Sequence, residues 1–247
     1  YLILNKMVGK SEIELILKKE NLSLEDHLVL ENYEPNDGAN KLYSFFTPIW
    51  LCELMYKLAI KNGFDQKKGK ILEPAAGIGN FLKVLQNPKN CTAFELDKLN
   101  FQIAKKRVPE ATINNNYFET SFLQPERFTQ LITERKTGKP TWLKDYPFDL
   151  VIGNPPYGKY KNMYSSFFRT LKFKQVEMFF MYQSMRLLKK GGLLVFISAS
   201  NFMRNNDTYK HEKEMIGKYA DFVDAYRMPK VFKNTSVPTD ILIFRKK

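Results

Sequence analysis

The sequence contains little of what would indicate a disulfide-bonded, metal-binding or membrane protein. Its 247 residues include two cysteines and two histidines. Cys52 and Cys91 both lie in apolar stretches, which predicts buried thiols of a cytoplasmic protein and not a disulfide framework. His27 and His211 lack cysteines at ligand spacing, so no metal site is expected. No apolar run approaches the ~20 residues that span a bilayer, and no signal peptide is recognisable, so neither membrane insertion nor export is expected.

Acidic residues are in short supply relative to basic ones. The chain has 39 lysines and arginines against 26 aspartates and glutamates, a formal net charge of +13. Such an excess can simply be a solvated surface. However, residues 105–107 are all basic, and a second basic group is interleaved with aromatic residues: Lys159, Lys161, Arg169, Lys172 and Lys174 with Tyr160, Tyr164, Phe167, Phe168 and Phe173. Cations beside aromatic rings suit phosphate and base contacts, so a polyanionic partner is predicted.

From about residue 41, predicted strands and helices alternate along the chain. The predicted strands are Lys70–Glu73, Thr92–Glu95, Thr112–Asn116, Phe148–Ile152, Leu193–Ser198, Phe222–Tyr226 and Asp240–Phe244. Helices are predicted at about 48–62, 79–87, 97–107, 175–189 and 208–219. This alternation predicts an α/β domain over residues 41–247, with a mostly parallel seven-stranded sheet covered by helices on both faces. The short return before the last strand predicts that this strand is the antiparallel member.

Residues 1–40 are predicted to form a short helical N-terminal extension. Ser11 with Glu14, and Ser23 with Asp26, have the spacing of capping boxes, so each pair predicts the start of a short helix. A turn-rich link follows. Within the α/β domain, residues 119–147 are polar and include Pro125, Gly138 and Pro140, so they are predicted to be an excursion between the third and fourth strands.

The stretch KGKILEPAAGIGNFLKVL predicts a strand, a glycine loop and a helix. Gly77 and Gly79 let a ligand approach the backbone, although a tight structural turn would show the same pattern. Glu95 ends the next strand, where a carboxylate can accept hydrogen bonds from both ribose hydroxyls, and Glu73 would attract an ammonium but repel a pyrophosphate. The predicted ligand is therefore S-adenosylmethionine. A dinucleotide is disfavoured because Leu82 stands where its fingerprint needs a third glycine.

Upstream, SFFTPIWLCELMYKLAIKNG predicts a helix with defined ends. Thr47 is the predicted N-cap, Pro48 the first helical residue, and Gly63 the left-handed residue after the helix. The free N–H groups and the Thr47 hydroxyl at the start of the helix can also hold a carboxylate. The sequence leaves both interpretations open, a capped amphipathic helix and one wall of a ligand site.

The stretch FDLVIGNPPYGKY ends a buried strand with two prolines, which cannot continue a sheet ladder. Asn154 offers a side-chain carbonyl, and Pro155 offers a backbone carbonyl beside it. Two acceptors that hold both N–H bonds of a planar amine favour a pyramidal nitrogen, whose lone pair then points at an electrophile. Tyr157 can stack on a flat substrate. The alternative is a rigid turn, because Asn-Pro dipeptides mark turns.

Taken together, FFTP, EPAAGIGNFL and Asn154-Pro155-Pro156-Tyr157, in this order, resemble a known family. They are similar to the gamma group of S-adenosylmethionine-dependent DNA methyltransferases, which methylate the exocyclic N6 amine of adenine in restriction-modification and phage-defence systems. The resemblance covers roughly residues 43–245 and implies a Rossmann-like methyltransferase fold. It further implies a flipped adenine in duplex DNA as substrate, no metal, and Asn154, Pro155 and Tyr157 as catalytic residues.

The resemblance also assigns residues to the cofactor and to the base. The implied cofactor-binding residues are Thr47, Glu73, Ala75, Gly77, Gly79, Glu95, Leu96, Asn116 and Phe180. Asn116 departs from the family, which often has Asp-Phe where this chain has Asn116-Tyr117. Phe232 would stack on the flipped base opposite Tyr157. In this family a target-recognition domain usually follows the last strand, so a recognition domain or subunit is expected outside this chain.

Three alternatives remain open at this point. Methyltransferases of the same fold that act on a protein glutamine amide or on an RNA base amine use a similar motif; the FTP helix and the basic balance favour DNA. A non-catalytic DNA-binding subunit could retain the fold, but the intact motif at 154–157 argues against it. A nicotinamide oxidoreductase is disfavoured by the missing third glycine.

Overall fold

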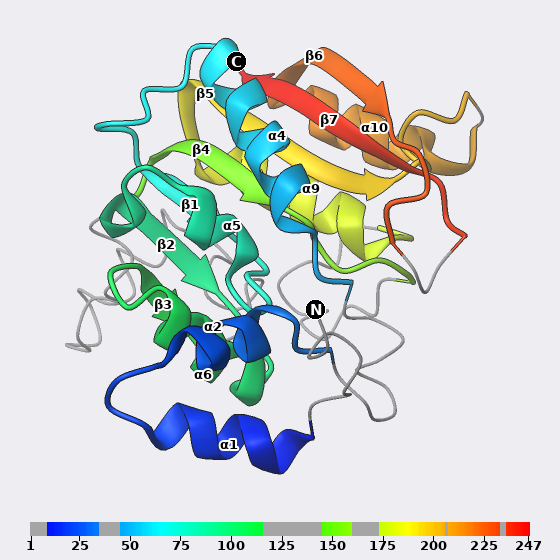
Figure 1. Ribbon diagram of the computed structural model, residues 1–247. Coiled ribbons are helices and arrows are strands. Elements are labelled where there is room, and N and C mark those ends of the chain that lie inside the picture. The colour runs from blue at the N-terminus through cyan, green and yellow to red at the C-terminus, as the bar shows by residue number, and fades with distance from the viewer. Residues whose placement is uncertain (1–8, 35–44, 116–144, 160–172, 206, 233–235) are drawn as a thin grey trace, which may run out of the picture.

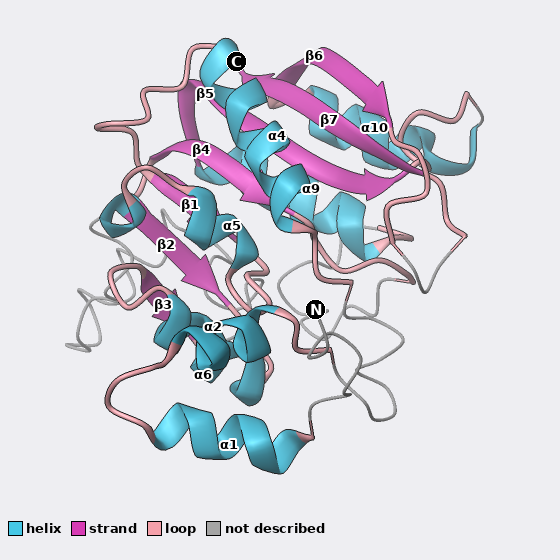
Figure 2. Cartoon of the chain, in the orientation of Figure 1, coloured by secondary structure: helices cyan, strands magenta, loops and turns pink. Residues whose placement is uncertain are grey.

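Short apolar runs form the seven strands of one sheet (Figures 1 and 2). The computed structural model describes residues 9–34, 45–115, 145–159, 173–205, 207–232 and 236–247. The strands are β1 Ile71–Glu73, β2 Cys91–Phe94, β3 Thr112–Asn114, β4 Phe148–Gly153, β5 Leu188–Ala199, β6 Ala220–Arg227 and β7 Thr239–Lys246. Their spatial order is β3-β2-β1-β4-β5-β7-β6.

The sheet is mostly parallel, as the alternation predicted. β1 pairs in parallel with β2 and β4, β2 with β3, and β4 with β5. β7 runs antiparallel to both β5 and β6, which confirms the prediction for the last strand. Parallel strands end at the same edge of a sheet, so β1, β2, β3 and β4 all present their carboxyl ends along one edge.

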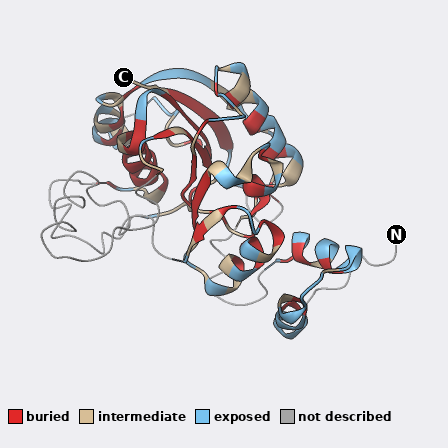
Figure 3. Ribbon diagram, turned by 90° about the vertical axis from the view of Figure 1, so that its left-hand side faces the viewer, coloured by how far each residue is buried: buried red, intermediate tan, exposed pale blue. Residues whose placement is uncertain are grey.

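Helices cover both faces of the sheet (Figure 3), so the central strands β1, β2 and β4 are mostly buried, whereas the edge strand β6 is largely exposed. The helices are α1 Lys10–Lys18, α2 Leu24–Glu31, α4 Ile49–Lys61, α5 Asn80–Val84, α6 Lys98–Arg107, α9 Val176–Leu187 and α10 Lys210–Gly217, with short 3-10 turns at Pro88–Asn90 and Asp207–Tyr209. Side chains of α4, α5 and α6 share one apolar core with the sheet, and those of α9 and α10 share the other. Each large apolar side chain buried in this way contributes ~1.5–3 kcal/mol.

The helix after the glycine loop is shorter than the predicted 79–87. It ends at Val84, and Leu85 already has an extended backbone with φ −70° and ψ 137°. Pro88 begins the next short turn. Since a proline disfavours helical backbone in the residue before it, Pro88 limits how far the helix can continue.

The N-terminal helices α1 and α2 pack against α6 and the glycine loop. Ile13, Leu30, Ile78 and Ile103 form a separate apolar cluster between these elements. The cluster shows that the N-terminal extension, which the sequence assigned to a domain of its own, is packed onto the α/β part by buried contacts.

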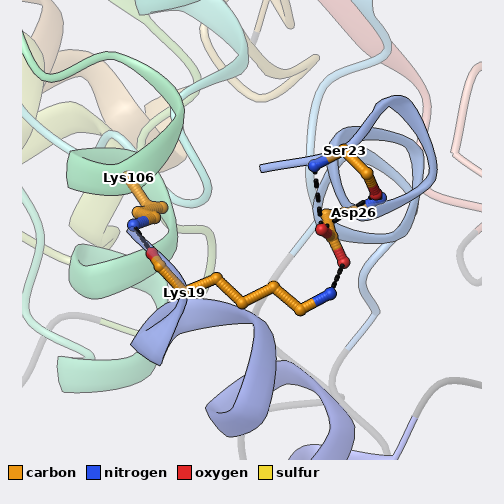
Figure 4. A network of polar contacts seen from close by, with 4 residues as sticks. All are labelled: Lys19, Ser23, Asp26 and Lys106. Atoms are coloured by element: carbon orange, nitrogen blue, oxygen red, sulfur yellow. Dashed lines mark hydrogen bonds and ion pairs between the residues drawn. The ribbon is translucent and has the colours of Figure 1, made fainter. Parts of the chain in front are cut away.

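The predicted capping boxes of this extension have different outcomes. Ser23 caps α2: its hydroxyl accepts from Asp26 N–H at 3.1 Å, and its own N–H donates to the Asp26 carboxylate at 2.9 Å. Figure 4 shows this box, with Lys19 bound to the same carboxylate and Lys106 donating to the Lys19 carbonyl. The box predicted at Ser11 is wrong, because α1 begins at Lys10, where the Gly9 carbonyl already accepts from the first turn.

The predicted N-cap of α4 is also wrong. Pro48 is the N-cap, without a side-chain cap, and its carbonyl accepts from Leu51 N–H at 3.0 Å and Cys52 N–H at 3.1 Å. Thr47 therefore lies one residue outside the helix. At the other end Gly63 has φ +96°, the left-handed conformation that was predicted.

Both cysteines are buried and free, as expected. Within the described ranges, we find no helix that is long and apolar enough to cross a membrane.

Candidate functional site

The predicted site residues gather along the edge where β1, β2 and β4 end. Glu73 is the last residue of β1, Glu95 follows β2, and Asn154 follows β4. Glu73 lies against Gly153, where a Cβ atom would come within 2.4 Å of Glu73 Oε1. Only glycine leaves room for the carboxylate at this position, so the strand order itself brings Glu73 next to the Asn154 motif.

Glu73 has a carboxylate that is completely buried and only half satisfied. Its Oε1 accepts from Ala75 N–H at 3.3 Å, while Oε2 has no hydrogen-bond partner among the described residues. Burial raises the pKa of Glu73 well above its usual range, and the nearby Glu95 adds to the rise. A buried carboxylate oxygen without a donor is costly, so it invites a cationic or N–H-bearing ligand.

Glu95 has both carboxylate oxygens held by backbone N–H groups. Oε2 accepts from Gly77 at 2.7 Å, and Oε1 accepts from Asp97 at 2.8 Å. Burial raises the pKa of Glu95 to about 7, against the opposing effect of these two hydrogen bonds. The bond to Gly77 fixes the glycine loop to the end of β2, so the loop and the predicted ribose acceptor are one unit.

The glycines of this loop form a tight turn, the alternative that the sequence left open beside a ligand approach. Gly77 and Gly79 have φ of +55° and +85°, which residues with a side chain rarely adopt. A Cβ on Gly77 would also approach the Phe46 ring to 2.9 Å. The loop is thus closely covered by the FFTP segment, and a side chain at Gly77 would separate the two.

Thr47 closes the site from the side of α4. It is buried, and its hydroxyl has no hydrogen-bond partner among the described residues. Its carbonyl accepts from the Asn80 side-chain amide at 2.9 Å. The unpartnered Thr47 hydroxyl and the unpartnered Glu73 oxygen fit a ligand that carries both a carboxylate and an ammonium, which is the amino-acid end of S-adenosylmethionine.

The remaining predicted cofactor residues have varied surroundings. Leu96 is about half exposed, and Phe180, on α9, is buried in the core that this helix shares with the sheet. Asn116 lies outside the described residues. Asn115, which the sequence analysis did not single out, donates its side-chain amide to the carbonyls of Glu95 at 2.9 Å and Leu96 at 3.1 Å. Asn115 therefore fixes the backbone of the predicted ribose and adenine contacts.

The side chain of Asn154 is held in a defined orientation. Its Nδ2 donates to the Phe45 carbonyl at 2.8 Å, and its Oδ1 accepts from the Tyr157 hydroxyl at 2.6 Å. Pro155 is buried beside it. Burial raises the pKa of Tyr157, and the nearby Glu177 adds to the rise, so the phenol stays a neutral donor. The Asn154 oxygen thus faces a hydrogen-bond donor and acts as an acceptor.

Phe45 occupies a position that the sequence analysis did not foresee. Its ring packs against Tyr157, with centroids 6.3 Å apart and planes 25° apart, and against Phe232, with centroids 5.8 Å apart. The predicted pair of base-stacking rings is therefore part of a set of three, with Phe45 in contact with both.

The loop at 154–158 is also fixed by a second buried carboxylate. Glu177, in the first turn of α9, accepts from Gly158 N–H at 3.3 Å and from the Asn201 side-chain amide at 3.2 Å. Gly158 accepts in turn from Val176 N–H at 2.9 Å. The Asn154 motif is thus tied to α9 and to the segment after β5. No motif in the sequence marked Glu177.

The basic residues predicted to meet a polyanion are only partly free to do so. Arg107 is buried, and Lys106 donates to the Lys19 carbonyl, so two residues of the 105–107 run are used inside the fold. In the second group, Phe173 is a core residue, and Lys174 donates to the Thr208 carbonyl at 2.7 Å. Lys159 is exposed; the members at 160–172 lie outside the described residues.

The fold is that of the class I S-adenosylmethionine-dependent methyltransferases. A modification subunit of a putative type I restriction enzyme from Vibrio vulnificus YJ016 superposes with a TM-score of 0.66 and 18% identity, over 93% of this chain and 51% of that one. A putative class I S-adenosylmethionine-dependent methyltransferase from Listeria monocytogenes gives a TM-score of 0.62 and 19% identity, over 92% of this chain and 69% of that one.

The chain belongs to the Eco57I restriction-modification methylase family, whose model matches residues 11–228. It is 27% identical over 219 residues to the type II methyltransferase M.HincII of Haemophilus influenzae, a match covering 83% of this chain and 37% of the relative. It is 29% identical over 124 residues to the type II restriction enzyme and methyltransferase RM.Eco57I of Escherichia coli, over 43% of this chain and 12% of that protein. The family confirms the resemblance found in the sequence, and S-adenosylmethionine is the cofactor that fold and family imply.

Proposed function

We propose that this chain transfers a methyl group to the exocyclic N6 amine of adenine in DNA, as the methylating part of a restriction-modification or phage-defence enzyme. The observation that carries the proposal is the orientation of Asn154. Its Nδ2 donates to the Phe45 carbonyl, which leaves Oδ1 as the acceptor, and the Tyr157 hydroxyl donates to that oxygen. Because Asn154 follows the strand whose last residue touches Glu73, an amine held there would lie beside the predicted cofactor position.

The proposed methyl transfer depends more on the positioning of the amine and the cofactor than on a general acid or base. When bound, S-adenosylmethionine supplies an electrophilic methyl group. Asn154 Oδ1 would accept one N–H of the amine and the Pro155 carbonyl the other, which would reduce delocalisation of the nitrogen lone pair and aim it at that methyl group. Glu73 and Thr47 would hold the amino-acid end of the cofactor, and Glu95 its ribose. Such prearranged dipoles and geometry can account for a large rate increase without a metal.

The aromatic set at this edge supports a base as the substrate. Tyr157 and Phe232 would stack on the two faces of a flipped adenine, and stacking on aromatic rings is worth ~1–3 kcal/mol per base, which offsets the stacking lost in the duplex. Phe45 contacts both rings, so a base can enter only if Phe45 shifts or lines the edge of the pocket. DNA as the polymer is supported by family membership and by the net charge of +13.

Labelled methyl transfer to DNA, RNA and protein in parallel tests this function. The expected product is N6-methyladenine in digested DNA. The Asn154→Ala variant should lose transfer by a factor of about 100 or more, since one oriented dipole of this kind is worth ~2.7–4 kcal/mol. Its affinity for S-adenosylmethionine, measured by calorimetry, should stay close to that of the unmodified chain, because Asn154 is assigned to the substrate.

A matched control and the alternatives complete this experiment. Asn32 is an exposed asparagine whose amide donates to the Leu28 carbonyl at the end of α2, so Asn32→Ala should transfer methyl groups normally. If the labelled methyl group were found only in RNA or only in protein, that polymer and not DNA would be the substrate. Equal loss of cofactor binding and transfer in Asn154→Ala would make Asn154 a structural residue.

The chain spans about a third of the length of M.HincII and of the type II methyltransferase M.HindII of Haemophilus influenzae, of which it covers 37% and 36%, and 12% of RM.Eco57I. The activity of any longer protein, including how it recognises a DNA sequence, is therefore part of the proposal. Residues 41–247 are proposed as the catalytic domain and residues 1–40 as its helical extension.

A further inference from the structure

Arg107 is an unusual cation for a surface helix. Its side chain is 3% exposed, although it ends a run of three basic residues on the last turn of α6. Glu31 of α2 is 3.9 Å from Nη2, is itself 43% exposed, and is the one carboxylate recorded in an ion pair with Arg107 among the described residues. Burial lowers the pKa of Arg107, and the charge of Glu31 opposes this. A buried charge with so weak a counter-ion is costly, so a role in the fold or the site should offset that cost.

The hydrogen bonds of Arg107 point to that role. Nη1 donates at 2.7 Å to the Ile78 carbonyl in the glycine loop and at 2.7 Å to Asn80 Oδ1. Because the arginine occupies the amide oxygen, Asn80 must present Nδ2 on its other side, and this group donates to the Thr47 carbonyl at 2.9 Å. One charged side chain thereby fixes two backbone segments and the orientation of the amide that joins them.

The two segments are adjacent, and both carry residues of the candidate cofactor site. Ile78 follows Gly77, whose N–H holds Glu95, and Thr47 carries the buried hydroxyl that has no partner among the described residues. Neither Arg107 nor Asn80 needs to touch a ligand to affect its binding. If the pair is lost, Thr47 and the glycine loop are no longer held at a fixed separation, and the cofactor must order them on binding.

We propose that Arg107 and Asn80 are positioning residues for S-adenosylmethionine, which set the spacing between Thr47 and the glycine loop. This rests on the cofactor assignment within the proposed function. The N-terminal extension takes part, since Leu30 packs in the same cluster as Ile78 and Glu31 is the counter-ion on α2. The extension thus shields from water the pair that shapes the site.

Cofactor affinity, measured at a temperature well below unfolding, tests the proposal. Arg107→Met and Asn80→Ala should each weaken S-adenosylmethionine binding by about tenfold. Each substitution leaves buried polar groups beside the site without their hydrogen-bond partner. The double variant should bind no more weakly than the weaker single variant, since residues that act as one unit are not additive. Arg107→Lys keeps the charge but lacks the several N–H donors of the planar guanidinium group, so it should recover only part of the affinity for S-adenosylmethionine.

Arg245 provides the matched control. It also donates to two backbone carbonyls, those of Gly191 at 3.1 Å and Asn62 at 2.9 Å, and Asn62 lies at the opposite end of α4 from Thr47. Arg245→Met should lower the melting temperature but leave cofactor affinity unchanged. A change of less than about twofold in Arg107→Met, or an equal loss in Arg245→Met, would overturn the positioning role. If Arg107→Met does not fold, the cofactor affinities of Asn80→Ala and Arg245→Met are compared instead, and a loss in Asn80→Ala alone supports the positioning role.

The unmodified chain separates this proposal from the cofactor assignment. If it shows no heat with S-adenosylmethionine, the proposed function fails first and the positioning role fails with it. If it binds, and the Arg107 and Asn80 variants bind equally well, the positioning role alone is wrong.

Discussion

At the scale of single residues, two neighbouring carboxylates have different surroundings and so different tasks. Glu73 is fully buried and lacks a donor on one oxygen, whereas both oxygens of Glu95 are held by backbone N–H groups. Glu73 can gain a strong partner from a cationic ligand without losing one. Glu95 must share oxygens that are already in use, so its charge state matters for what it can accept.

Glu95 should make cofactor binding depend on pH around neutrality. Burial raises its pKa to about 7, so the carboxyl is mostly neutral at pH 6 and mostly charged at pH 8. A charged carboxylate accepts hydroxyl hydrogen bonds more strongly, so affinity for S-adenosylmethionine should increase with pH over this range, by at most about tenfold per unit for one proton. Calorimetry at several pH values measures this slope.

The Glu95→Gln variant is the control for this titration. Glutamine keeps an acceptor oxygen but does not ionise, so the rise in affinity around pH 7 should disappear in the variant. A slope that persists unchanged would assign the titration to another group. The same shift also acts on stability. The folded chain binds the proton more tightly than the unfolded chain, whose pKa is near 4.5, so this group makes folding less favourable as pH rises from about 4.5 to 7.

The sequence analysis predicted the site residues that belong to a recognisable motif. It missed the residues whose role depends on a tertiary contact. Glu73, Glu95 and Asn154 were predicted because each ends a strand. Arg107 was taken for surface charge, yet it is four residues after Ile103, which is buried on the same face of α6. That spacing was available in the sequence. The contact of Phe45 with both Tyr157 and Phe232 was not, because it depends on how α4 is placed over the sheet.

At the scale of elements, some helix ends are set by hydrogen bonds within one turn, and others are set by contacts with distant parts of the chain. The capping box of α2 forms because Ser23 and Asp26 satisfy each other within one turn. Thr47 has a good capping side chain, yet α4 begins after Pro48, because the Thr47 carbonyl is bound to Asn80 and Thr47 is held outside the helix. The mostly parallel sheet and the helices between its strands were predictable from alternation, whereas such helix ends were not, because tertiary contacts decide them.

Ser23 and Ser11 offer a direct test of this difference. Ser23→Ala removes the cap of α2 and should lower its stability by about 1 kcal/mol. Hydrogen exchange of the α2 amides, with urea unfolding of the chain, measures the change. Ser11→Ala should have no comparable effect, since Ser11 lies inside α1 and the cap there is Gly9. Equal effects of the two substitutions would mean that the capping hydrogen bonds of Ser23 add nothing.

At the scale of the whole molecule, the described helices pack around one sheet, and the candidate site lies at the edge of that sheet. α4, α5 and α6 cover one face, α9 and α10 the other, and α1 and α2 pack on the glycine-loop side. This arrangement brings the candidate cofactor residues and the proposed amine-binding residues to one edge of the sheet, supported by buried contacts. Among the described residues, no helix or strand forms a separate layer that could enter a DNA groove.

The net charge of the chain predicts that it binds duplex DNA by charge and not by sequence. With a net charge of +13, contacts to phosphates supply the affinity, and such contacts are the same for every sequence. Two duplexes of equal length and composition but different base order should bind within about threefold of each other, and the logarithm of the affinity should fall linearly with the logarithm of salt concentration. Fluorescence anisotropy over a salt series measures both. A preference above about tenfold that survives high salt would show that base readout lies within these 247 residues, since base contacts are far less sensitive to salt than phosphate contacts.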